Sequence, residues 1–110
     1  MIRSAFTLLV AVSLGATITG SACAGDAKTG RKAATACQTC HGMDGLSKLP
    51  EAPNLAGQVE PYLVKALTEY RDGTRNNQIM SVVAKGLSDT EIANLAAYYA
   101  GIQIEVLPPG

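Results

Sequence analysis

Hydrophobic residues recur at the spacing of helical turns in the second half of the chain, and no segment alternates convincingly between apolar and polar positions as a strand does. The clearest stripe precedes Gly101, a residue suited to end a helix, and consists of Ile92, Leu95, Ala96 and Tyr99. Directly before it, Ser88 and Glu91 have the spacing of a capping box, in which each side chain accepts from the other residue's backbone N–H. This pattern predicts the last helix of the chain.

Two further helices are predicted between residues 60 and 86. The first begins near Pro61, which suits the first helical position, and its apolar stripe consists of Leu63, Ala66, Leu67 and Tyr70. Gly73 is expected to terminate it. The second is shorter, covers residues 78–85, and has Asn77 as its cap and Gly86 as its stop.

The helical part of the chain is expected to start after Asp26, which is placed to cap a helix over residues 28–37 with Gly30 on it. Residues 43–54 form the longest loop, and residues 102–110, which contain two prolines, are expected to be extended. No internal repeat or linker divides this pattern. It predicts one all-α unit of three to four helices.

The first 24 residues differ from the rest of the chain and have the pattern of a secretory signal peptide. Arg3 supplies the positive charge, residues 5–18 are an apolar run, and residues 22–24 read Ala-Cys-Ala, a small-residue cleavage site. The run is short of the ~20 residues that span a bilayer. We therefore expect cleavage after Ala24, a mature domain over residues 25–110, and export to the periplasm. Lipid attachment at Cys23 is the alternative.

Removing this segment changes the composition. Losing 24 of 110 residues leaves 86, and losing Arg3 leaves eight Lys and Arg against nine Asp and Glu, a net charge of −1. No basic run remains, which argues against a nucleic-acid partner. A chain this small without tryptophan has a thin core and often depends on a covalent staple or a bound group.

Two cysteines remain, in the sequence Cys37-Gln38-Thr39-Cys40-His41. A disulfide oxidoreductase would place such a motif beside a βαβ pattern, which is missing here. A structural zinc site needs four ligands, and the motif offers three. A structural disulfide stays possible, although it would close a very short loop and restrain the unfolded chain little. The fourth interpretation is Cys-x-x-Cys-His, the attachment motif of c-type haem.

The spacing suits haem attachment. Thiols three positions apart on a helical turn lie on one side of the chain, where each can form a thioether with one vinyl group of the porphyrin. His41 then lies beneath the ring and can ligate the iron. We therefore predict one covalent haem c attached through Cys37 and Cys40, with His41 as an axial ligand.

The sixth position of the iron is open to two methionines of the mature chain. Met43 lies two residues after His41, on the same side of the ring, and does not easily reach across it. Met80 is far enough along the chain to return over the opposite face, although methionine is also a common core filler. A thioether ligand favours electron transfer, whereas an open site favours ligand binding.

The chain resembles class I cytochromes c, in particular the small bacterial group that includes cytochromes c553, c5 and the halves of cytochrome c4. The matching segments are CQTCHG at 37–42, PNLAGQ at 53–58, YRDGTRNNQIM at 70–80 and LSDTEIANLAAYYAG at 87–101. The resemblance spans nearly all of residues 25–110. It implies a small cytochrome c fold wrapped around the haem.

The resemblance also implies roles for single residues. Met80 would be the distal ligand, and the carbonyl of Pro53 would accept a hydrogen bond from the other ring nitrogen of His41. Gly30 would allow the first and last helices to cross closely near Tyr98 or Tyr99. The first helix departs from the family pattern because it carries alanines where members often have an aromatic residue.

The roles of three further residues stay open at this point. Arg71 and Arg75 either offset the charge of the haem propionates or are solvated surface residues. Tyr70 either forms a hydrogen bond near the Met80 sulfur or packs within its stripe.

The expected function is one-electron transfer in the periplasm, within a respiratory or photosynthetic chain, and not catalysis. The partners would be transient redox proteins that donate and accept electrons, and the mature chain would have no membrane span. The alternatives are a haem subunit of a larger dehydrogenase complex and a gas-binding haem sensor.

Overall fold

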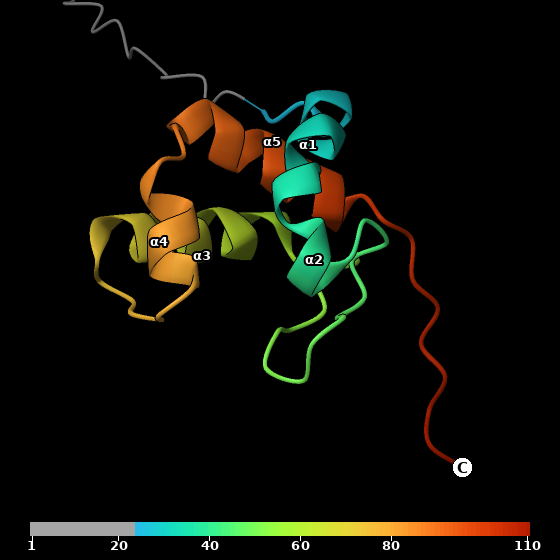
Figure 1. Cartoon of the computed structure of the whole chain (residues 1–110). Helices are drawn as coiled ribbons and strands as arrows, with labels where there is room; N and C mark the ends of the chain where they lie inside the picture. Colours follow the sequence, from blue (N-terminus) through green and yellow to red (C-terminus); the bar gives the residue numbers. More distant parts are fainter. Residues whose placement is uncertain (1–23) are drawn as a thin grey trace, which may run out of the picture.

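The computed structural model describes residues 24–110 (Figure 1). The elements of this part, in chain order, are α1 (Ala27–Ala33), η1 (Ala34–Ala36), α2 (Gln38–His41), α3 (Glu60–Asp72), α4 (Met80–Lys85) and α5 (Asp89–Ala100). No strand occurs between residues 24 and 110. The predicted all-α fold is confirmed, whereas the predicted signal peptide lies outside the described residues apart from Ala24.

The first predicted helix is interrupted. Asp26 caps α1 as expected, because its side chain accepts from the backbone N–H groups of Lys28 and Thr29. The α-helix does not reach Cys37, however. Its last turn tightens into the 3-10 element η1, whose Cys37 N–H donates to Ala34 O at 2.9 Å. A separate short helix, α2, then carries the motif up to His41.

The two middle helices follow the predicted signals. Pro61 lies in the first turn of α3, and Gly73 ends the helix with a left-handed backbone at φ 84°. α4 begins at Met80, two residues later than expected. The reason is local, because the Asn77 Oδ1 accepts from Ile79 N and Met80 N at 2.9 Å each and holds residues 77–79 in a turn.

The last helix matches its prediction. The side chains of Ser88 and Glu91 form the expected capping box. Residues of the predicted stripe are buried, namely Ile92, Leu95, Ala96 and Tyr99. α5 packs against α1 and α3, and α3 packs against α4, so that α5 lies at the centre of the helical contacts (Figure 1).

The crossing of α1 and α5 depends on Gly30. A Cβ atom on Gly30 would collide with the backbone carbonyl of Asn94 and would lie 3.0 Å from the Cβ of Tyr98. The predicted close crossing is therefore present, and Tyr98 is the tyrosine at the contact. Asn94 adds a second link between α5 and the start of α1, because its Oδ1 accepts from Asp26 N at 2.7 Å.

The remaining segments lack regular structure. The long loop after α2 runs below the helices and returns to α3, while the tail after α5 extends away from them (Figure 1). Within residues 24–110, no helix is long and apolar enough to cross a membrane.

Candidate haem site

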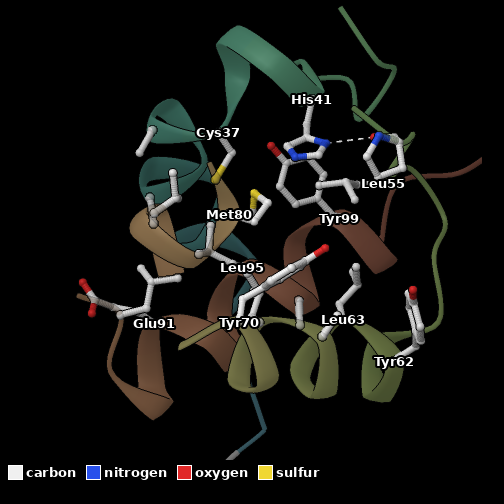
Figure 2. Close-up of a pocket in the computed structure, with 18 of the residues that line it drawn as sticks. Cys37, His41, Leu55, Tyr62, Leu63, Tyr70, Met80, Glu91, Leu95 and Tyr99 are labelled. Atoms are coloured by element: carbon white, nitrogen blue, oxygen red, sulfur yellow. Dashed lines mark hydrogen bonds between the residues drawn. The ribbon is translucent and has the colours of Figure 1, made fainter. Parts of the chain in front are cut away.

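An apolar cavity of about 300 Å³ lies between α2, α3, α4 and α5. Its lining includes His41, Pro53, Leu63, Tyr70, Met80 and Leu95. A second hollow of about 130 Å³ shares Cys37, His41 and Met80 with it and adds Cys40. The side chains predicted to bind haem therefore border these two adjoining hollows, and Figure 2 shows Cys37, His41 and Met80 around the larger one.

The short helix α2 places the motif along one edge of this space. Its backbone bonds are local, with His41 N donating to Cys37 O at 2.9 Å. Both cysteines are half-buried free thiols. Burial raises the pKa of the Cys37 thiol, and the neighbouring Cys40 adds to this rise. The two sulfurs form no disulfide with each other.

His41 is held by a hydrogen bond to the loop. Its side chain is 6% exposed, and its Nδ1 lies 2.8 Å from the carbonyl oxygen of Pro53. A carbonyl only accepts, so Nδ1 carries the proton and donates, and Nε2 keeps its lone pair. Figure 2 shows this second nitrogen on the cavity side. The expected contact between His41 and Pro53 is present, and its geometry suits an imidazole that ligates a metal.

The two methionines after residue 24 differ in position. Met80, the first residue of α4, lines both hollows, and its sulfur faces the same space as Cys37 and His41 (Figure 2). Met43 instead packs against the core cluster beside α5 and lines neither hollow. Of these two thioethers, only that of Met80 faces the space that His41 also borders.

The two arginines differ in their position relative to the cavity. Arg71 bridges helices, with its Nη1 2.7 Å from an Asp89 carboxylate oxygen, and it does not line the cavity. Arg75 does line it, with the guanidinium 4.7 Å from the centre of the Tyr70 ring. Arg75 Nη1 donates a hydrogen bond to Tyr62 OH, which raises the pKa of Arg75, and its charge is retained at the cavity rim. Tyr70 also lines the cavity, and in the described part of the chain no hydrogen bond joins it to Met80.

Sequence reasoning missed the hydrogen bonds that tie α5 to the motif. Tyr99 OH donates to Gly42 O at 3.1 Å, and Tyr98 OH donates to Met43 O at 2.5 Å. The helical stripe predicted that Tyr99 is buried, but the partner of its hydroxyl lies far away in the sequence. No local pattern identifies such a partner.

The residues of the cavity fit a haem. The space is bordered mainly by apolar side chains, two thiols lie at one edge, and an imidazole nitrogen and a thioether sulfur face it. These are the donor types that attach a c-type haem and ligate its iron. Between residues 24 and 110 no group of three or more His, Cys, Asp or Glu side chains is placed to hold a bare metal ion.

Comparison with known proteins agrees with this site. The chain is 43% identical over 100 residues to cytochrome c4 of Pseudomonas aeruginosa, covering 90% of this chain and 50% of that protein. It is 46% identical over 80 residues to cytochrome c-554(548) of Halomonas halodenitrificans, covering 70% of this chain and 96% of that protein. The crystal structure of reduced recombinant cytochrome c4 from Pseudomonas stutzeri superposes with a TM-score of 0.68 at 36% identity, covering 73% of this chain and 47% of that one.

The chain thus spans about half the length of the cytochromes c4 that it matches. Residues 27–102 match the family described as cytochrome c, whose members carry iron in a covalently bound haem. This match contains all the helices between residues 24 and 110, and Asp26, which caps the first of them, lies one residue before it. The chain belongs to the cytochrome c family, in the class I group that includes cytochrome c4.

Proposed function

We propose that this chain is a periplasmic one-electron carrier with one covalently attached haem c. The observation that carries the proposal is the convergence of Cys37, His41 and Met80 on one apolar cavity, with the orientation of His41 fixed by Pro53. Cys37 and Cys40 hold the haem, and His41 and Met80 are the axial ligands. The single Cys-x-x-Cys-His sequence limits this domain to one haem.

The side chains of the site have separate tasks. When bound, the haem supplies a couple between Fe(II) and Fe(III) that takes up and releases one electron. His41 donates through Nε2, while its Nδ1–H stays on the Pro53 carbonyl and keeps the ring from rotating. Met80, the first residue of α4, would supply its thioether sulfur to the iron. The apolar lining, which includes Leu63 and Leu95, excludes water and limits rearrangement around the iron.

This arrangement does not favour catalysis, and we propose that the chain is not an enzyme. With His41 and Met80 both bound to iron, no coordination site stays open for a substrate. The same reason argues against a gas sensor, whose iron must exchange a ligand readily.

We propose that partners dock beside the cavity. Three apolar side chains at the start of α4 are exposed there, namely Ile79 at 50%, Val82 at 73% and Val83 at 39%. Small, brief contacts suffice for electron transfer. A permanent place in a larger dehydrogenase is the second candidate, which this apolar surface also suits. Co-purification of a second polypeptide at fixed stoichiometry would favour that candidate.

The closed iron is tested by the optical spectrum of the reduced protein before and after addition of carbon monoxide. We expect a low-spin c-type spectrum that carbon monoxide leaves unchanged, because Met80 fills the sixth position. A prompt spectral shift would contradict the carrier proposal and favour a sensor or an enzyme.

A further inference from the structure

The last turn of α5 is bonded to both ends of the loop that carries Pro53. At the start of the loop, the hydroxyls of Tyr99 and Tyr98 donate to Gly42 O and Met43 O. At its end, Gly57 N donates to the backbone carbonyl of Tyr99 at 3.0 Å. The path of the loop between these points is therefore fixed relative to α5.

The first of these anchors lies directly beside the predicted iron ligand. Gly42 follows His41 in the chain and has a left-handed backbone at φ 74°. Its carbonyl oxygen accepts from Gly45 N at 3.2 Å as well as from Tyr99 OH. Within the same loop, Leu55 N donates to Gly45 O at 2.7 Å. A chain of hydrogen bonds thus leads from Tyr99 through Gly42 and Gly45 to Leu55, two residues after Pro53.

The two tyrosines are rigid donors. Tyr99 is 3% exposed and belongs to the core cluster. Its ring lies edge-on to that of Tyr98, with 5.0 Å between the ring centres. Burial raises the pKa of Tyr99 above its ordinary value, so the hydroxyl keeps the proton that it donates.

We propose that Tyr98 and Tyr99 are positioning residues for the axial histidine, because their hydroxyls hold Gly42 and Met43 and so keep the Pro53 carbonyl on His41 Nδ1. This inference rests on the proposed function, since it assigns His41 to iron. A fixed acceptor on the outer ring nitrogen sets both the orientation and the donor strength of a metal-bound imidazole. Loosening the loop would weaken that hydrogen bond while leaving the set of ligands intact.

The test uses the haem-loaded, reduced protein with Tyr98→Phe, Tyr99→Phe and both substitutions. Phenylalanine keeps the ring packing and removes the donor, and Gly42 O keeps its bond from Gly45 N. Proton NMR measures how fast the His41 Nδ1–H exchanges with solvent, with the amides of the buried residues Leu95 and Ala96, beyond the first turn of α5, as internal references for global opening. We expect exchange to be about three- to tenfold faster relative to these amides in each single variant, the range for loss of one neutral hydrogen bond.

Ser88→Ala is the matched control, because it removes the cap at the other end of α5 and lies away from the loop. It should destabilise the protein without changing His41 exchange relative to the two amides. Equal acceleration of all three protons in the tyrosine variants, or a Ser88→Ala effect on His41 as large as theirs, would overturn the inference. A wild-type spectrum without low-spin iron would contradict the proposed function as well, whereas a normal spectrum with unchanged exchange would contradict this inference alone.

Discussion

His41 and Met80 are held in place by different local hydrogen bonds. The ring of His41 is oriented through its hydrogen bond to Pro53, at 2.8 Å. Met80 is held through its backbone, because its N–H donates to the Asn77 side chain at 2.9 Å. Two neutral donors in an apolar cavity favour the less charged Fe(II) state, and a thioether raises the reduction potential. Through its hydrogen bond to the Met80 backbone, Asn77 is expected to influence the iron without contacting it.

Replacing Asn77 with alanine should make the sixth position of the iron more accessible. Loss of a side-chain cap costs about 0.5–2 kcal/mol, and here the cost is concentrated at the turn that carries Met80. We expect the reduced Asn77→Ala protein to take up carbon monoxide in a stopped-flow absorbance experiment, under conditions in which the wild-type spectrum stays unchanged. Asn76→Ala removes an identical side chain at the exposed neighbouring position and should leave the spectrum unchanged, as in wild type. Equal uptake in the two variants would argue against the role of Asn77.

The helices show what local sequence determines and what it does not. The caps at Asp26 and Ser88 and the stop at Gly73 were predicted correctly, because each depends on residues within one turn. The 3-10 break after Ala33 was missed, since a run of small helix-forming residues does not show where the chain must turn toward a cavity. The late start of α4 was missed because the Asn77 side chain accepts from the amides of Ile79 and Met80, the residue before the helix and its first residue.

The site was also predictable only in part, because local sequence does not determine contacts between residues far apart in the chain. The spacing of Cys37, Cys40 and His41 identifies the attachment motif without any structure. The sequence position of Met43, two residues after His41, and the family resemblance already favoured Met80 as the second ligand, and the structure adds that Met80 lines the cavity whereas Met43 does not. The contacts of Tyr98 and Tyr99 join positions more than fifty residues apart, and no periodicity encodes such pairs.

The crossing of α1 and α5 should tolerate no side chain at Gly30. Gly30→Ala would force its methyl group against the Asn94 backbone carbonyl, and moving backbone atoms costs more energy than moving the end of a flexible side chain. Overpacking of this kind costs about 1–3 kcal/mol, more than the ~1 kcal/mol that alanine gains over glycine in a helix. Gly86→Ala is the control, because nothing lies within 4 Å of its added methyl group and its φ is −90°. Guanidinium unfolding of the two haem-loaded variants should show a lower midpoint for Gly30→Ala alone. A Gly86→Ala protein that is equally destabilised would contradict this explanation.

The molecule as a whole has little core of its own. Ile92 is the largest fully buried side chain of the described part, and the main cluster around Leu95 contains two alanines. Much of the remaining apolar surface borders the cavity. A small domain of this kind depends on a bound group to complete its interior. The haem is therefore expected to contribute to folding as well as to function.

The intact mass of the exported protein, measured under denaturing conditions, tests both the proposed processing and the haem count. We expect a chain that begins at Gly25 and carries one haem, because thioethers at Cys37 and Cys40 survive unfolding. A chain that begins at an acylated Cys23 would show the lipid-anchored alternative. A mass without haem would contradict covalent attachment.

The assignment of Met80, rather than Met43, as the second iron ligand beside His41 is tested most directly by a spectroelectrochemical redox titration of three proteins: wild type, Met80→Leu and Met43→Leu. Leucine has a similar volume to methionine but cannot ligate iron, so the two variants differ only in which thioether is lost. Axial ligands set haem potentials over a range of about 0.8 V, far beyond the effect of repacking one side chain. We expect a strongly lowered midpoint potential for Met80→Leu and a wild-type value for Met43→Leu. A wild-type potential in Met80→Leu, or a strong decrease in Met43→Leu, would contradict this assignment.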